Sequence, residues 1–300
     1  MDAFLIRLLN ALLYASVLFL ISGGLSLIYG VMRIVNLAHG NLYAFGAYVT
    51  AWVIGLVAGT AGASAASPRL LVLFLLLPAG ALAAGGLGAI LEPTLLRPFY
   101  KRAEEYQLLV TFGLLMILED LIRFLWGPYP LTASALWENL GSLSIGGTIY
   151  PGYNLLVIAI GAAAAVFLWA FVYRTRFGVV LRATSQDMRM AAALGIDVNR
   201  VYVQAFALGC LMAGLGGAII VPSQSAVLGM GVDALVLSFI VVVIGGLGSL
   251  EGALVGALIV GIVRELGIEF FPELELAILY LMAALVLLVR PAGLFGRATT

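Results

Sequence analysis

The chain has 300 residues, of which 63% are hydrophobic and 10% are charged, and its formal net charge is zero. Soluble domains are about half apolar and a quarter charged, so this composition excludes an ordinary soluble protein and indicates an integral membrane protein. The balanced charge gives no basic surface for a nucleic acid partner, and we expect none. With a single cysteine, Cys210, neither an internal disulfide nor a cysteine metal cluster can form.

Apolar runs of membrane length follow one another along the whole chain. About 20 helical residues cross the ~30 Å hydrocarbon core of a bilayer. The candidate spans are 8–31, 36–58, 70–91, 108–126, 153–173, 201–221, an interrupted run over 234–266, and 274–289. We predict an all-α fold, a polytopic transmembrane helical bundle of about eight to ten spans with broken helices, forming one domain over residues 1–300. The first run is too long for a cleaved signal peptide, so we expect an uncleaved span.

The first break lies at residues 30–41, which read Gly-Val-Met-Arg-Ile-Val-Asn-Leu-Ala-His-Gly-Asn. Polar chain persists at membrane depth only where protein or water surrounds it. We therefore predict that Asn36, His39, Gly40 and Asn41 line a transport pathway, where the helix N-terminus can face an anionic group such as a carboxylate. In the alternative interpretation His39 only holds the break together, and Asn36 or Asn41 only caps the helix. With one histidine and one cysteine, no metal site is expected.

The run at 108–126 contains three charged residues, Glu119, Asp120 and Arg123. Charges at membrane depth cost several kcal/mol unless they are paired (roughly 3 or more). Glu119 and Arg123 are four residues apart and share one helical face, so we predict a structural ion pair. A proton relay through Glu119, Asp120 and His39 is the alternative.

Orientation follows from arginine and lysine, which are retained on the cytoplasmic side in short loops. Residues 97–102 and 174–200 and the C-terminus are therefore predicted to be cytoplasmic, whereas 127–152 and 222–233 contain no Lys or Arg and should face outward. The side of the N-terminus stays open. Segment 174–200 combines arginines with an amphipathic stretch, which favours docking on a protein partner, with binding to anionic lipid as the alternative.

The second break contains Gly245, Gly246, Gly248 and Ser249. Both flanks are membrane helices, so these glycines are not a nucleotide-binding loop. They allow the backbone to turn, and we predict two helices that turn back on each other. The four residues are expected to line the pathway cleft, unless their role is only structural. Lys101 is not part of a Walker A loop, so any ATP must be bound by partner subunits, and the chain is expected to be no enzyme and to hold no cofactor.

Three segments together resemble LivH-type permeases, the transmembrane subunits of branched-chain amino acid ABC importers. They are residues 30–48, residues 182–217, and residues 245–256 with Gly245-Gly246-Leu247-Gly248-Ser249. The resemblance implies a protein of the bacterial or archaeal inner membrane, embedded in lipid. It also implies three kinds of protein partner: a second related permease, two cytoplasmic ABC ATPases, and a periplasmic or extracellular solute-binding protein.

The resemblance further implies that segment 174–200 couples the chain to the ATPases, with candidate residues Gly178, Arg182, Ala183, Gly195, Ile196, Asp197 and Arg200. The expected function is translocation of branched-chain or similar amino acids into the cytoplasm. Glu119 stands where relatives are expected to have glutamine, so transport of urea or short amides is the alternative within the family. An autonomous proton-coupled transporter is the alternative outside it.

Overall fold

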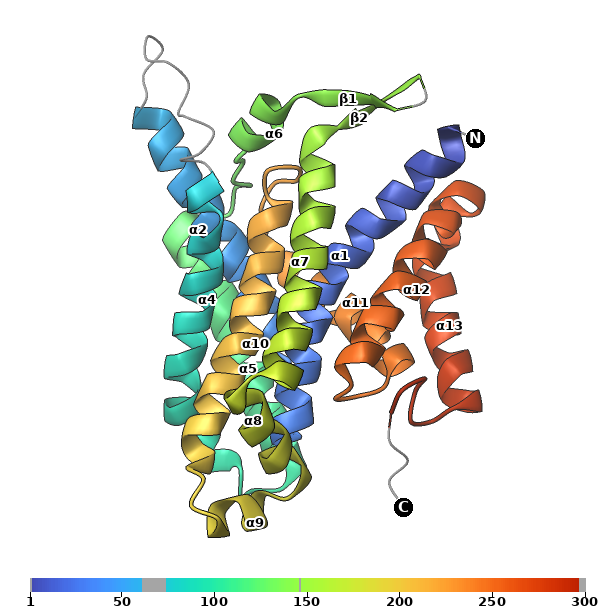
Figure 1. Cartoon of the computed structure of the whole chain (residues 1–300). Helices are drawn as coiled ribbons and strands as arrows, with labels where there is room; N and C mark the ends of the chain where they lie inside the picture. Colours follow the sequence, from blue (N-terminus) through green and yellow to red (C-terminus); the bar gives the residue numbers. More distant parts are fainter. Residues whose placement is uncertain (1, 61–73, 146, 297–300) are drawn as a thin grey trace.

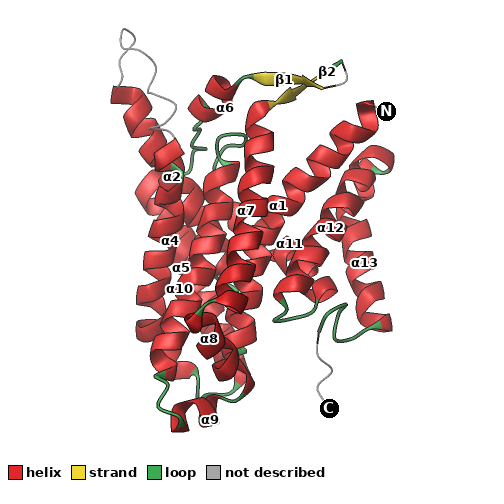
Figure 2. Cartoon of the chain, in the orientation of Figure 1, coloured by secondary structure: helices red, strands yellow, loops and turns green. Residues whose placement is uncertain are grey.

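The computed structural model describes residues 2–60, 74–145 and 147–296, and within them the protein is a bundle of helices (Figures 1 and 2). The long helices are α1 (Asp2–Met32), α2 (His39–Thr60), α4 (Pro78–Leu91), α5 (Glu104–Trp126), α7 (Gly152–Arg174), α10 (Val198–Ile220), α11 (Met230–Gly245), α12 (Leu250–Phe270) and α13 (Glu275–Val289). Short helices are η1 (Glu92–Leu96), η2 (Arg97–Phe99), α6 (Ala135–Leu140), α8 (Arg176–Gln186), α9 (Met188–Ala193) and η3 (Pro272–Leu274). Strands β1 (Ser142–Ile145) and β2 (Thr148–Pro151) form an antiparallel hairpin in which Ser142 pairs with Pro151.

The predicted all-α polytopic bundle is confirmed, with fewer spans than expected. Within the described residues, six stretches have the length and composition to cross a membrane: Phe4–Met32, His39–Val57, Phe74–Phe99, Gly152–Arg174, Val198–Ile220 and Pro272–Val289. Helices α11 and α12 are bent by 115° at their break, and counting the pair as one span gives up to seven. The predicted eight to ten was higher because it included α5, which is long enough but carries three charges in its apolar stretch.

The segments rich in arginine gather at one end of the bundle, which we call the basic end. Figure 1 shows η2, α8, α9 and the end of α13 there, at the bottom of the view. The two loops without Lys or Arg meet at the opposite end, where the backbones of Leu131 and Ala226 exchange two hydrogen bonds of 3.0 and 2.9 Å. This segregation matches the predicted orientation. The N-terminus lies at the same end as α6 and the hairpin.

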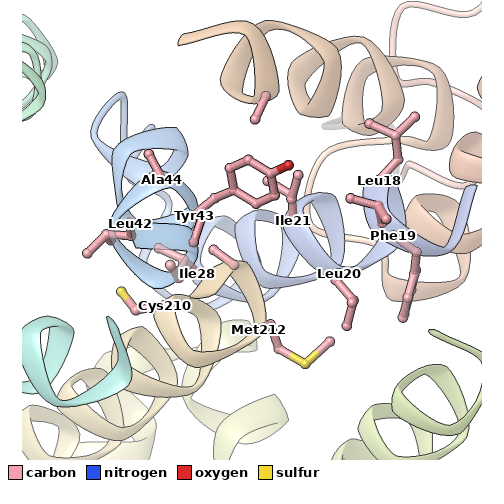
Figure 3. Close-up of a cluster of buried hydrophobic side chains, with 14 of the residues drawn as sticks. Leu18, Phe19, Leu20, Ile21, Ile28, Leu42, Tyr43, Ala44, Cys210 and Met212 are labelled. Atoms are coloured by element: carbon pink, nitrogen blue, oxygen red, sulfur yellow. The ribbon is translucent and has the colours of Figure 1, made fainter. Parts of the chain in front are cut away.

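Helix α10 packs against α1, α2 and α4. Small residues permit the close approach: a Cβ on Gly46 would collide with the backbone of Gly214, and a Cβ on Gly217 would collide with the carbonyl of Tyr43. Figure 3 shows part of the buried apolar cluster of the same helices, among them Ile28 of α1, Tyr43 of α2 and Met212 of α10. The core of the molecule is therefore the crossing of α1, α2 and α10.

Candidate functional site

The first break returns the chain to the middle of α1. Helix α1 ends as Arg33 adopts a left-handed conformation with a φ of 54°, the one positive φ outside glycine in the described chain. Helix α2 then begins at His39, whose ring nitrogen Nε2 lies 3.0 Å from the carbonyl oxygen of Ile21. Asn36 closes the turn: its Oδ1 accepts a hydrogen bond from Ala38 N at 3.1 Å, and its carbonyl accepts one from His39 N at 3.2 Å. The start of α2 is thus fixed beside the middle of α1.

Helix α11 also begins at this level, against the start of α2. A Cβ on Gly40 would collide with the carbonyl of Gly231, and a Cβ on Gly231 would collide with Oδ1 of Asn41. Asn41 Nδ2 donates a hydrogen bond of 2.6 Å to the carbonyl of Leu115 in α5. We call this meeting of α1, α2, α5 and α11 the central junction. Two helix N-termini face each other there, which requires glycine on both.

The predicted pathway residues of the first break are enclosed in this state. Asn36, His39 and Asn41 have no exposed surface. The N–H groups of Ala38 and His39 are bonded to Asn36, so they are not open to an anion. These contacts correspond to the structural alternative that the sequence left open. Each of the three polar side chains nevertheless keeps one atom without a protein partner: Asn36 Nδ2, His39 Nδ1 and Asn41 Oδ1.

The three charged residues in the apolar part of α5 are arranged differently from the prediction. Glu119 Oε1 accepts a hydrogen bond of 2.7 Å from the backbone N of Gly229, the left-handed residue that precedes α11. Arg123 is exposed. Ion pairs in the described residues join Arg7 to Glu269, Arg97 to Glu92, Arg200 to Asp197 and Arg264 to Glu275. The predicted pair of Glu119 and Arg123 is not among them, because Glu119 turns toward α11 while Arg123 points out of the fold.

The second break forms the predicted turn. Gly246 and Gly248 have φ values of 107° and 80°, which side chains rarely adopt. Ser249 caps α12, because its Oγ accepts a hydrogen bond of 3.0 Å from Gly252 N. The chain after α13 returns to cover the turn, where Phe295 N donates a hydrogen bond of 2.8 Å to the carbonyl of Gly245. This break is therefore a tight turn that joins α11 to α12 at an angle of 115°.

Gly248 and Ser249 line a cavity of about 970 Å³ at the basic end, whereas Gly245 and Gly246 are not among its lining residues. The cavity lies between the end of α1, α8, the second break and the chain after α13, and its polar side chains include Tyr29, Arg33, Arg182 and Glu251. Ser26 of α1 also lines this cavity, five residues beyond Ile21, whose carbonyl oxygen lies 3.0 Å from His39 Nε2, whereas His39 itself does not line it. The structure thus brings Ser249 together with Arg182 and not with His39. This proximity could not be predicted from the sequence, since Arg182 is far from both breaks along the chain.

The predicted coupling segment consists of two short helices, each started by a side-chain cap. Thr175 caps α8, because its Oγ1 accepts a hydrogen bond of 3.0 Å from Gly178 N. Asp187 caps α9, because its Oδ1 accepts hydrogen bonds of 2.9 Å from both Arg189 N and Met190 N. Gly195, with a φ of 84°, ends α9. The caps explain why α8 and α9 are separate, because Asp187 terminates one helix and starts the next.

The remaining coupling candidates fix this segment to its neighbours. Gly178 packs on the carbonyl of Val172, where a Cβ would collide. Arg182 Nη1 donates a hydrogen bond of 2.6 Å to the carbonyl of Val172, and the Arg182 guanidinium lies 5.0 Å from the centre of the Tyr173 ring. Asp197 caps α10 through Arg200 N and pairs with the Arg200 side chain at 2.9 Å. Ala183 is exposed and Ile196 is half-buried.

Apolar side chains project from α9 at the basic end. Met188, Met190 and Leu194 are 49%, 58% and 76% exposed. Methionines on an exposed helix adapt to the shape of a partner surface. The segment therefore offers a rigid, capped backbone with an adaptable apolar tip.

The fold and its two breaks define a polytopic membrane permease. The chain belongs to the family described as branched-chain amino acid transport system permease component, whose sequence model matches residues 7–288. It is a multi-pass protein of the inner (plasma) membrane, as the resemblance predicted.

Three curated relatives match nearly the full chain. It is 26% identical to the high-affinity branched-chain amino acid transport system permease protein BraD of Pseudomonas aeruginosa, over 98% of this chain and 96% of the relative. The identity to LivH of Escherichia coli (strain K12) is also 26%, with the same coverage. The probable branched-chain amino acid transport permease protein LivH of Methanocaldococcus jannaschii is 25% identical over 96% of this chain and 91% of the relative.

Proposed function

We propose that this chain is the subunit through which an ATP-driven importer moves branched-chain or similar amino acids into the cytoplasm, with ATP bound by partner ATPases. Family membership supports the permease role, and the names of the relatives supply the substrate class. The observation that carries the ATP-driven part is the capped pair α8–α9, which presents an exposed apolar tip at the basic end.

The tip of α9 is the docking point for an ATPase. Met190 and Leu194 are exposed beside arginines, at the end predicted to face the cytoplasm. Arginine-rich rims and methionine or leucine anchors suit a groove on a soluble protein. Closure of two ATPases would then push on α9, and through it on the membrane helices.

The second permease covers α5. Asp120 and Arg123 are exposed on a helix of membrane length, and neither has an ion-pair partner in the described residues. Facing lipid would cost each charge several kcal/mol (roughly 3 or more), so protein or a water-filled path must cover this face. The solute pathway then runs along α5 between the two permeases.

The central junction opens onto that pathway when the transporter changes the side of the membrane to which the pathway is open. Its unpartnered atoms, Asn36 Nδ2, His39 Nδ1 and Asn41 Oδ1, are able to bond a solute once α2 and α11 separate. Asn41 is closest to the pathway, since its amide already bonds α5 at Leu115. The enclosed junction is then the closed state of the gate.

The test of ATPase docking places a charge on the apolar tip. In the importer assembled with its ATPases, Leu194→Glu is expected to abolish both uptake and substrate-stimulated ATP hydrolysis, because a carboxylate cannot enter an apolar groove. Leu194→Met keeps the surface apolar and should behave as the wild type. Full ATPase stimulation in Leu194→Glu would contradict docking at α9.

Two further measurements separate the alternatives. Vesicles that contain the purified chain alone, under a proton gradient and without ATPases, should accumulate no leucine, whereas uptake would support a proton-coupled transporter. In the assembled importer, excess isoleucine should compete with labelled leucine and excess urea should not. Competition by urea would move the substrate class to short amides.

A further inference from the structure

A buried carboxylate lies at the basic end, and the proposed function gives it no role. Glu92 has no exposed surface and begins the π-helical turn η1, which continues α4. Its Oε2 accepts a hydrogen bond of 2.7 Å from Arg97 Nη2, and its Oε1 accepts one of 2.6 Å from the Tyr100 hydroxyl. Single π-helical turns are rare and are frequent at functional sites. A carboxylate is buried only with partners of this kind.

The contacts of Glu92 continue into the coupling segment. Tyr100 packs edge-on against Tyr202 of α10, with ring centres 5.5 Å apart and planes at 75°. The Tyr202 hydroxyl donates to Met188 Sδ at 3.1 Å, and Met188 is the first residue of α9. We call Glu92, Arg97, Tyr100, Tyr202 and Met188 the Glu92 cluster. It forms an unbroken path of side chains from α4 to α9.

The two ends of this path differ in rigidity. At the α4 end, charged hydrogen bonds to a buried carboxylate are short and strong. Burial and the hydrogen bond to Glu92 also raise the pKa of Tyr100 above its ordinary value, so the hydroxyl, which is protonated at physiological pH in any tyrosine, stays a donor under more alkaline conditions as well. At the α9 end, one hydroxyl meets a flexible thioether. The cluster is therefore bound to α4 by two strong hydrogen bonds and contacts α9 through one adaptable hydrogen bond.

Helix α4 is in turn fixed to α10 along its length. A Cβ on Gly88 would meet the side chain of Cys210, and a Cβ on Gly214 would meet Ala84 and the Gly80 carbonyl. Such close packing makes α4 and α10 move together. A displacement of α9 that reaches η1 is consequently delivered to both helices at once.

We propose that the Glu92 cluster transmits the movement of α9 to α4 and α10, with Glu92 and Tyr202 as positioning residues for coupling. The inference rests on the proposed function, because it takes α9 as the ATPase docking point. It adds the route by which docking reaches the membrane helices.

Tyr202→Phe is the sharpest test, because it removes the contact with Met188 and leaves the aromatic packing in place. In the assembled importer we expect unchanged basal ATP hydrolysis and only a small drop in melting temperature, with leucine transported per ATP lowered about two- to tenfold, the scale of one lost hydrogen bond. Glu92→Gln keeps the shape of the side chain and should lower the same ratio. Tyr280→Phe makes the matched change on an exposed residue of α13 and should have no effect.

The outcomes separate this inference from the proposed function. If Leu194→Glu uncouples the importer while Tyr202→Phe and Glu92→Gln transport like the wild type, the Glu92 cluster has no role in coupling. A drop in transport that only follows a drop in melting temperature would also overturn it, since that result means a purely structural cluster. If Leu194→Glu leaves coupling intact, the proposed docking of an ATPase at α9 is wrong, and the inference about the Glu92 cluster that rests on it is wrong as well.

Discussion

At the scale of single residues, the central junction depends on glycine. Gly40 and Gly231 stand where two helices begin against each other, and their neighbours are backbone carbonyls and the Asn41 amide. Backbone cannot move aside as a flexible side chain can. Any side chain at these positions must therefore separate α2 from α11.

Gly40→Ala is expected to lower the stability of the chain by about 1–3 kcal/mol, the usual cost of overpacking. The measurement is thermal unfolding in detergent. Gly55→Ala is the matched control in the same helix, because a Cβ there meets nothing within 4 Å. It should cause no loss and should stabilise by up to about 1 kcal/mol through helix propensity. Equal melting temperatures for the two variants would contradict the tight junction.

The sequence predicted a polar break near residues 36–41, and the structure contains one, since polar groups within apolar runs are visible without a structure. It did not predict which role they have, because the partners of His39 and Asn41 are backbone carbonyls of Ile21 and Leu115. Carbonyls are present in every residue and leave no signal in a sequence. The predicted ion pair of Glu119 with Arg123 was wrong for the same reason. The partner of Glu119 is the backbone N–H of Gly229, and backbone groups cannot be recognised as partners in a sequence.

At the scale of elements, the short helix α9 is the part most dependent on a single side chain. It has six residues, fewer than an isolated helix needs, and Asp187 bonds two of its first N–H groups. Asp187→Ala removes both bonds and should destabilise α9 by about 1 kcal/mol. We expect faster amide exchange across α9 and weaker uptake.

Asp187→Asn is the control, because asparagine caps helices as well as aspartate. Its exchange rates and uptake should match the wild type. If alanine and asparagine both impair uptake equally, the charge of Asp187 matters rather than its cap.

Elements defined by local patterns were predicted well. The second break is marked by Gly245 to Ser249, and glycine and serine determine a turn and a cap wherever they lie. The π-helical turn at Glu92 was missed, because it depends on Tyr100 and Arg97 folding back around the carboxylate. The count of spans differs at α5, because this helix is long enough to cross a membrane but carries three charges in its apolar stretch.

At the scale of the whole molecule, the two ends and the two sides of the bundle differ in kind. Loops with arginine lie at one end and loops without it at the other, so the ends follow from counting charges. The sides do not. Helix α13 exposes Leu281, Leu285 and Leu288 with no charge among them, whereas α5 exposes Phe124 beside Asp120 and Arg123. Under the proposed function, α13 faces lipid and the second permease covers α5.

Cysteine labelling distinguishes these two sides. Phe124 and Leu288 are both 85% exposed, and the native Cys210 is fully buried and should not react. In the chain purified alone in detergent, a maleimide should label Phe124→Cys and Leu288→Cys alike. In the complex with the second permease and the ATPases, Phe124→Cys should be protected, because the partner covers α5, while Leu288→Cys should react as before. Unchanged labelling of Phe124→Cys in the complex would mean that α5 lies outside the interface, and the charges of Asp120 and Arg123 would then need another cover.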